Sequence, residues 1–247
     1  MRAAAVWVLL MVCSCDSADA VEVQARSGPQ RSTFVELYTS EGCSSCPPAD
    51  ERFSVLLKHP DLWRGVVPVA FHVDYWDYLG WKDRFSSATH TRRQRDYAAR
   101  WGKDSVYTPM LVIDGREDRS WNLYGIVPGR QEAGILEATS DASTAHVKYT
   151  PPTGGKSWVA HAAILGSGLR SRPSSGENTG QLLHHDFAVL TSASAPLRLT
   201  DGMSYEADLS FGSITEGKDA RKALAVWVTE EGGTEAVQCA GNYWPQR

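Results

Sequence analysis

The sequence predicts an α/β domain, with a central mixed sheet flanked by helices, followed by a smaller antiparallel β-rich domain. Cys43 and Cys46 lie where a strand-like segment passes into a helix-like one. Strand and helix patterns alternate in the first half of the chain, which is typical of α/β proteins. Helix signals vanish after about Ser140, where Gly, Pro and Ser clusters separate short apolar runs. We therefore expect domains at residues 33–139 and 140–247.

Bulk properties agree with a globular protein of this size. The chain has 247 residues, of which 42% are hydrophobic, and its formal net charge is −4. This length suits a domain of ordinary size with a smaller second one. Because the basic residues are dispersed and the charge is slightly negative, nucleic acid is excluded as an expected partner.

Residues 1–20 are predicted to be an export signal, and residues 21–32 a tether. The apolar stretch is too short to span a bilayer. The segment from Val12 to Cys15 resembles a lipoprotein box, which would make Cys15 a lipid anchor; Asp16 then favours the inner membrane. The alternative is ordinary cleavage after Ala20. The mature protein is expected to be periplasmic or a membrane-anchored lipoprotein, or else secreted.

Periodicity and turn residues give the elements of the first half. Pro47 and Pro48 suit the first turn of a helix, where no N–H is needed. Ser86 or Ser87 is the expected cap of the second helix. The expected order is strand 33–39, helix 49–57, strand 66–73, helix 86–100, a strand ending at the Asp114-Gly115 turn, strand 116–124 and helix 129–138.

The second half shows apolar runs at a spacing typical of an antiparallel sandwich or sheet. A polar segment, 167–180, is expected to be a long loop. The expected strands are 158–165, 187–191, 205–211, 224–229 and 236–243.

The Cys-x-x-Cys motif carries the expected chemistry. A sulfur at a helix N-terminus faces free backbone N–H groups and the positive end of the helix dipole, which favour the thiolate. An exported compartment permits disulfides. Cys43, at the strand end and more exposed, is the expected attacking thiolate, and Cys46 the resolving thiol. The alternative is a static disulfide that staples the turn. Cys239 is expected to be buried and inert.

Three segments resemble the signature of a known family: 37–50, 71–83 and 106–109. They are similar to a family of exported bacterial proteins catalogued as a domain of unknown function within the thioredoxin-like superfamily. The resemblance implies a thioredoxin-like fold for residues 33–139. It places Thr108-Pro109 where that fold has a cis proline beside the active-site sulfurs. Pro109 would hold an extended substrate segment next to Cys43, and the Thr108 backbone would offer hydrogen bonds.

The expected function is an exported thiol–disulfide oxidoreductase that acts on protein thiols or disulfides, with an unknown redox partner and no bound cofactor. One alternative is a copper-binding or delivery protein that uses Cys43, Cys46 and His72 or His90, since thiolates and imidazole suit copper. Another is a non-catalytic binding protein with a structural disulfide. The membrane is an expected partner only through Cys15.

Most polar residues outside the motif are expected to have structural roles. Three aspartates near His72 should satisfy loop backbone groups, since their spacing matches no calcium or zinc site. They are Asp74, Asp77 and Asp83. His184-His185 is expected to be a solvated strand end. Glu36 is either a buried acid that assists the cysteines or an outward-facing edge residue.

Overall fold

The computed structural model describes residues 22–245, so the expected signal at residues 1–20, with Cys15, lies outside the described residues. Within them, the helices are α1 (Cys46–Phe53), α2 (Ala88–Arg100) and the 3-10 helices η1 (Ser54–Lys58), η2 (Asp77–Leu79) and η3 (Leu123–Gly125). The strands are β1 (Val23–Arg26), β2 (Thr33–Thr39), β3 (Val66–His72), β4 (Met110–Ile113), β5 (Arg116–Asp118), β6 (Ile135–Ser140), β7 (Thr144–Thr150), β8 (Trp158–Ser167), β9 (Leu169–Ser171), β10 (Leu183–His185), β11 (Ala188–Pro196), β12 (Arg198–Asp201), β13 (Ser204–Ser210), β14 (Arg221–Glu230) and β15 (Ala236–Tyr243).

The predicted fold class, a thioredoxin-like α/β domain followed by a smaller β domain, is wrong. Strands make up 43% and helices 14% of the structure. An eight-stranded mixed sheet has the order β15-β14-β8-β11-β3-β2-β4-β5, and a five-stranded antiparallel sheet has the order β1-β6-β7-β13-β12. The physical reason is that the apolar strand β3 is buried along its whole length, and strands β11 and β15 from the second half of the chain lie against it.

The eight-stranded sheet therefore joins both halves of the chain. Strand β11 pairs with β3 in parallel at Ala188 and Ala70, and with β8 in antiparallel orientation. Residues 33–139 and 140–247, which we expected as two domains, both supply strands to this sheet. Strand β1, inside the expected tether 21–32, pairs with β6.

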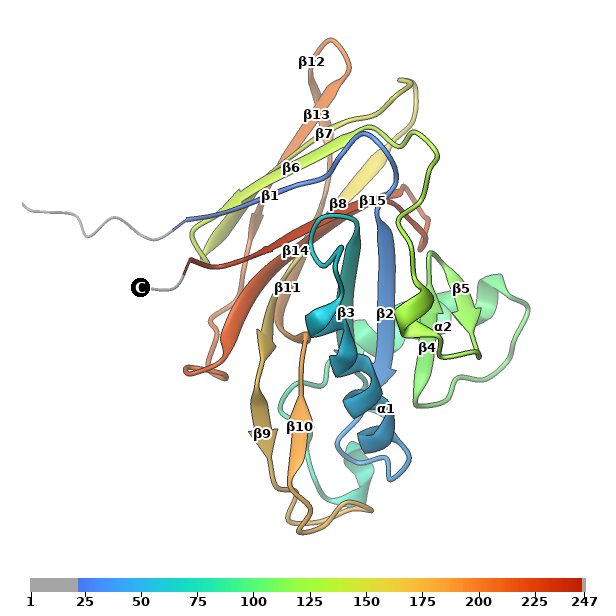
Figure 1. The fold of residues 1–247 in the computed structure, drawn as a ribbon, viewed down its shortest axis with the longest axis vertical. Coiled ribbons are helices and arrows are strands. Elements are labelled where there is room, and N and C mark those ends of the chain that lie inside the picture. Colours follow the sequence, from blue (N-terminus) through green and yellow to red (C-terminus); the bar gives the residue numbers. More distant parts are fainter. Residues whose placement is uncertain (1–21, 246–247) are drawn as a thin grey trace, which may run out of the picture.

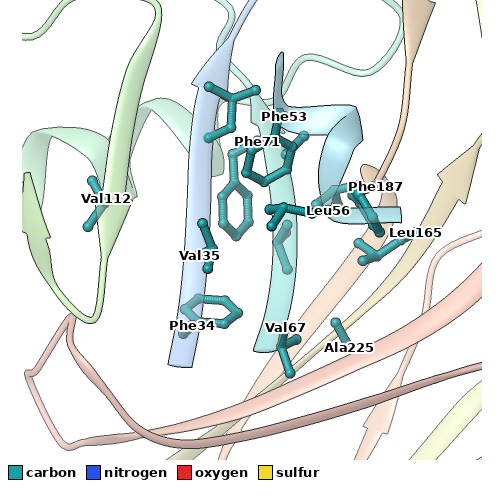
Figure 2. Packing of buried hydrophobic residues seen from close by; sticks show 14 of the residues in the cluster. Phe34, Val35, Phe53, Leu56, Val67, Phe71, Val112, Leu165, Phe187 and Ala225 are labelled. Atoms are coloured by element: carbon teal, nitrogen blue, oxygen red, sulfur yellow. The ribbon is translucent and has the colours of Figure 1, made fainter. Parts of the chain in front are cut away.

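Two hydrophobic cores lie on this framework. In the first, Phe53 from α1 makes an edge contact with Phe187, with 5.8 Å between ring centroids, and Leu165 lies nearby (Figure 2). The second lies between the five-stranded sheet and β8, β14 and β15, with Leu136, Val147 and Val226 fully buried. Side chains from both halves of the chain fill each core.

The expected helix at 129–138 is also wrong, because this stretch enters β6. Gly134 has a φ of +77°, a backbone conformation that a helix cannot continue through, and the strand begins directly after it. Leu136 and Ala138 are buried in the core, while Glu137 and Thr139 are more exposed. This alternation has the period of two residues that is typical of a strand. By contrast, strand 33–39 is confirmed at its bounds, and Ser87 caps α2 through a hydrogen bond from the backbone N–H of Thr89.

The fold brings three chain segments together at one end of the eight-stranded sheet. Strand β2 ends at Thr39, residues 40–45 form what we call the cysteine loop, and α1 follows. The small β9–β10 sheet lies beside α1, at the opposite end of the molecule from the β12–β13 hairpin (Figure 1). None of the helices within residues 22–245 is long and apolar enough to cross a membrane.

Candidate functional site

The two sulfurs lie at the start of α1, with Cys43 in the cysteine loop and Cys46 as the first helical residue. Both are free thiols. The backbone N–H of Cys46 donates to the carbonyl of Cys43 at 3.1 Å, which closes the turn between them. Cys43 is 1% exposed and Cys46 is fully buried, so the difference in exposure between the two cysteines is small. Ser44 and Ser45, beside Cys43, are exposed.

The environment separates the two sulfurs chemically. A hydrogen bond from Cys46 is the main cause that lowers the pKa of Cys43 to about 6; burial opposes it, while hydrogen bonds from Ser45 and Thr108 add to it. Burial raises the pKa of Cys46 well above the ordinary value, and the nearby Cys43 and Asp50 raise it further. One sulfur is therefore suited to be a thiolate at neutral pH and the other to remain a thiol.

Thr108 lies against the sulfur of Cys43. Its carbonyl oxygen is 3.7 Å from Sγ of Cys43, and its hydroxyl oxygen accepts a hydrogen bond from the indole of Trp76 at 2.8 Å. The peptide bond to Pro109 is cis, and β4 begins directly after it. Trp76 packs closely on the cysteine loop because Gly42 has no side chain: a Cβ there would lie 2.8 Å from Cβ of Trp76.

A buried acid lies behind Cys46, and it is Asp50 of α1. Its Oδ1 accepts a hydrogen bond of 2.7 Å from the hydroxyl of Thr39. That hydroxyl also favours the thiolate of Cys46. Glu36, proposed from sequence for this role, instead forms an ion pair with Arg93 at 2.7 Å and accepts from Tyr97 at 2.5 Å.

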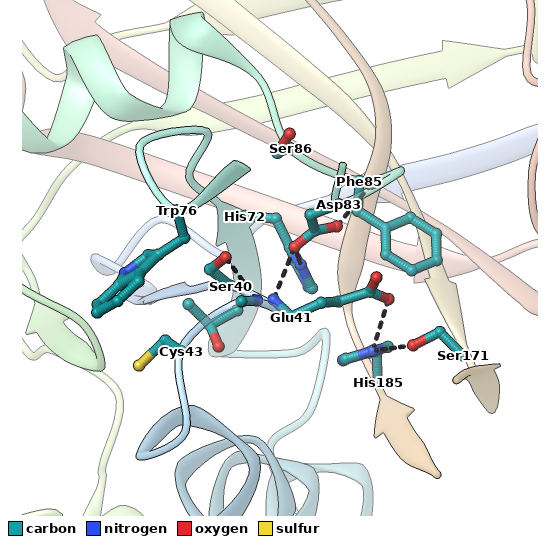
Figure 3. Close-up of polar contacts among 12 residues, drawn as sticks. Ser40, Glu41, Cys43, His72, Trp76, Asp83, Phe85, Ser86, Ser171 and His185 are labelled. Carbon is teal, nitrogen blue, oxygen red and sulfur yellow. Dashed lines mark hydrogen bonds and ion pairs between the residues drawn. The ribbon is translucent and has the colours of Figure 1, made fainter. Parts of the chain in front are cut away.

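A network of charged side chains lies on the inner side of the cysteine loop (Figure 3). Asp83 accepts from the backbone N–H of Glu41 at 2.9 Å and lies 2.7 Å from Nδ1 of His72. The Glu41 carboxylate lies 3.1 Å from Nε2 of His185 and accepts from the indole of Trp81 at 2.6 Å. As expected, Asp83 satisfies loop backbone groups.

His185 connects this network to the acid behind Cys46. Its Nδ1 lies 3.6 Å from Asp50, and its Nε2 lies 3.2 Å from the hydroxyl of Ser171. Burial disfavours its charge, but the facing carboxylates of Asp50 and Glu41 outweigh burial and raise the pKa of His185 to about 9. The ring is therefore an imidazolium at neutral pH, so it holds two carboxylates in place and does not serve Ser171 as a base. The expectation that His184-His185 is a solvated strand end is wrong for His185, which is 2% exposed.

The loop between β9 and β10 supplies the residues that sequence reasoning missed. Asn178 donates through Nδ2 to the carbonyl oxygens of Glu41 and Cys43, both at 2.9 Å. The carboxylate of Glu177 accepts from the backbone N–H of Ser44 at 2.9 Å. No local pattern could have indicated them, because about 135 positions separate them from the cysteines.

The copper set and the leftover cysteine are not assembled with the motif. Within residues 22–245, no group of three or more His, Cys, Asp or Glu side chains is placed to hold a metal ion. Nδ1 of His72 contacts Asp83, and His90 contacts the backbone carbonyl of His72 at 2.9 Å. Cys239 is fully buried, 3.5 Å from the carbonyl of Ser32, and burial raises its pKa.

Comparison with known proteins adds a family and a fold. No curated protein matches the chain. Two solved structures are similar over 88% of it: protein AGR_C_4864 of Agrobacterium tumefaciens, with a TM-score of 0.61, 22% identity and 95% of that chain covered, and HBP35 of Porphyromonas gingivalis, with a TM-score of 0.60, 15% identity and 76% covered. At these identities the likeness concerns the fold alone. The model of one family matches residues 34–229, so the chain belongs to the family described as protein of unknown function, DUF1223.

Proposed function

We propose that this protein is an exported thiol–disulfide oxidoreductase that acts on the cysteines of other proteins. The contrast between the two sulfurs carries the proposal: at the start of one helix, the pKa of Cys43 is lowered to about 6 and that of Cys46 is raised. At pH 7, about nine-tenths of Cys43 would be thiolate. A purely structural disulfide requires no such difference between the pKa values of its two cysteines. A disulfide across so short a loop also adds little stability.

The reaction has two exchange steps. The Cys43 thiolate attacks one sulfur of a substrate disulfide; a bond forms between the two sulfurs, and the other substrate sulfur leaves as a thiolate. Cys46 then loses its proton and attacks Sγ of Cys43, which releases the second substrate sulfur and leaves a Cys43–Cys46 disulfide. The substrate gains two electrons and the pair loses two. A dithiol partner protein restores the pair, and the reverse sequence oxidises a substrate.

The surroundings assign a role to each neighbour. The hydroxyls of Ser45 and Thr108 stabilise negative charge on Cys43. Asp50 is placed to accept the proton that Cys46 must lose, by way of the Thr39 hydroxyl, which gives its own proton to the buried carboxylate and takes up the proton of Cys46. Thr108 borders the Cys43 sulfur, and under this proposal a substrate segment lies beside Thr108 and Pro109. Since Cys43 is only 1% exposed, we expect Trp76 and the exposed loop residues to move aside for a substrate.

Export is part of the proposal and rests on the sequence of residues 1–20. Outside the cytoplasm, thiol–disulfide exchange can run toward disulfides as well as away from them. Anchoring at Cys15 would keep the protein at a membrane, while cleavage after Ala20 would release it.

Trapping a mixed disulfide tests the reaction. We expect purified Cys46→Ser protein, incubated with oxidised glutathione or a cystine-containing peptide, to keep a stable adduct on Cys43, because the resolving sulfur is gone. The wild type should convert the same adduct to the Cys43–Cys46 disulfide and release the thiol. Mass spectrometry of the intact and digested protein measures both products.

Two controls make the test specific. Cys43→Ser should form no adduct, since Cys46 is fully buried and its pKa is raised. Cys239→Ser should behave as the wild type, because Cys239 is buried away from the motif. If Cys46→Ser protein gains no adduct, or gains it no faster than Cys43→Ser protein, the redox function is wrong and the pair is structural.

A further inference from the structure

The cysteine loop is held from outside by a segment of the second half of the chain. The side chain of Asn178 is fully buried, and its amide nitrogen donates to the carbonyl oxygens of Glu41 and Cys43, both at 2.9 Å. These two carbonyls flank Gly42. The neighbouring Glu177 accepts from the N–H of Ser44. Thus the β9–β10 loop contacts the backbone on both sides of the reactive cysteine.

We propose that Asn178 is a positioning residue of the redox site, which holds the cysteine loop in the conformation that turns the Cys43 sulfur toward Ser45 and Thr108. This inference rests on the proposed function and adds to it a role for the second half of the chain.

The geometry explains how an amide could act through the backbone. The Cys43 carbonyl accepts two hydrogen bonds, from the Cys46 N–H and from Asn178, which fixes the orientation of its peptide group. The Cα–Cβ direction of Cys43 is then set, and Sγ lies 3.2 Å from the Ser45 hydroxyl. The same bonds turn the negative ends of two carbonyl dipoles toward Asn178. Without them, the loop can rotate and the sulfur loses the hydroxyl groups that favour its thiolate.

Packing alone does not account for an asparagine at this position. Its Oδ1 is buried and has no hydrogen-bond partner in the described part of the chain. An unpaired buried acceptor is unfavourable, so an apolar side chain would suit a purely structural position better. What the amide contributes is its two donors, and both are directed at the cysteine loop.

The pH dependence of Cys43 alkylation by iodoacetamide tests the inference without any turnover. We expect Asn178→Ala to move the midpoint of the rate profile upward by about one pH unit or more, which is about tenfold less thiolate at pH values below the midpoint. Asn178→Ser, which keeps one donor, should give a smaller shift. Digestion and mass spectrometry assign the label to Cys43, and Tyr75, whose pKa burial raises to about 12, stays neutral over the pH range used.

Asn242→Ala, at an exposed position, is the control for loss of a side-chain amide that donates to a backbone carbonyl. Asn242 on β15 also donates its amide to a backbone carbonyl, that of Gln24 at 2.9 Å, but far from the motif in the sheet order. The Asn242→Ala variant should leave the midpoint of the Cys43 alkylation profile unchanged, even if the melting temperature of this variant falls as much as that of Asn178→Ala.

The outcomes separate this inference from the proposed function. An unchanged midpoint in Asn178→Ala, or an equal shift in the control, would overturn the positioning role while adduct trapping by Cys46→Ser still stood. If neither Asn178→Ala nor Asn178→Ser folds, Asn178 is a residue required for folding, and the positioning role is overturned as well. A shifted midpoint without any trapped adduct would support the positioning role and remove only the redox function.

Discussion

His185 is the residue on which the charges behind the cysteine loop converge. Glu41 and Asp50 contact its two ring nitrogens, and the ring of His72 lies 5.0 Å away in an edge arrangement. Three of these groups come from the first half of the chain, whereas His185 belongs to β10. A single imidazolium thus lies between two buried carboxylates and offsets part of their charge.

This arrangement predicts a loss of stability at alkaline pH. The folded-state pKa of His185 is raised from 6.5 to about 9. Its contribution is therefore fully present below pH 6.5 and is lost as the pH rises through about 9, on the order of 3 kcal/mol in total. The contribution of Cys43 to stability changes in the opposite direction over the same pH range, because the pKa of Cys43 is lowered on folding and not raised. We therefore expect the decline to be clear in Cys43→Ser protein, by urea unfolding at several pH values.

A second substitution identifies the group responsible. Adding His185→Asn to the Cys43→Ser protein should flatten the pH dependence between 6.5 and 9. Adding His184→Asn should leave it unchanged, since His184 is the exposed neighbour on the same strand. A decline that persists without His185 would contradict the assignment.

At the scale of single residues, the sequence identifies the site residues that belong to a local motif. Cys43 and Cys46 are recognisable from their own spacing, and Thr108 from its position before Pro109 and β4. His185 and Asn178 could not be found in this way, because their partners are more than 130 positions away. The pair His184-His185 shows the difficulty, since His184 is exposed and His185 is 2% exposed. The tertiary fold, and not the local sequence, determines which of the two adjacent histidines is buried.

At the scale of elements, turn residues decide where the sequence prediction succeeds or fails. Ser87 marks the start of α2, and the strand at 33–39 is recognisable from its apolar run. The stretch 129–138 was expected as a helix, although Gly134 weakens one. In the structure, Gly134 adopts a positive φ and approaches the next strand so closely that an added Cβ would lie 2.2 Å from the carbonyl oxygen of Thr150.

Gly134→Ala is therefore expected to destabilise the protein by about 1–3 kcal/mol, because backbone atoms cannot move aside as a flexible side chain can. Two matched substitutions separate the causes. Gly102 has a positive φ but open space, so Gly102→Ala should cost about 1 kcal/mol. Gly154 has open space and no such φ, so Gly154→Ala should change stability by less than about 0.5 kcal/mol. Chemical denaturation measures all three, and equal effects at Gly134 and Gly102 would show that the close contact is unimportant.

At the scale of the whole molecule, the sequence indicates strands but not their neighbours. Each of the five strands expected in the second half overlaps an observed strand. Their assembly depends on pairings that no local pattern reveals, such as Ala188 with Ala70 between β11 and β3. Pro68 fits in β3 because pairing to β11 occurs only at Ala70, so the missing N–H interrupts no bond on that side. The result is one sheet and two shared cores, in which side chains such as Phe187 and Trp227 pack on the first half.

A chain that ends at Ser140 should therefore fail to fold cooperatively. It would lose β8, β11, β14 and β15, leave one edge of β3 unpaired and expose the core side chains that Phe187 and Trp227 cover. We expect no sigmoidal thermal transition by circular dichroism and no shift in the alkylation midpoint of Cys43 relative to an unfolded peptide. Co-expression of residues 141–247 as a second chain should restore both signals if the halves assemble as they do in the intact protein. A truncated chain that unfolds cooperatively alone and keeps a lowered Cys43 midpoint would contradict the shared-core account, since the first half would then carry the site unaided.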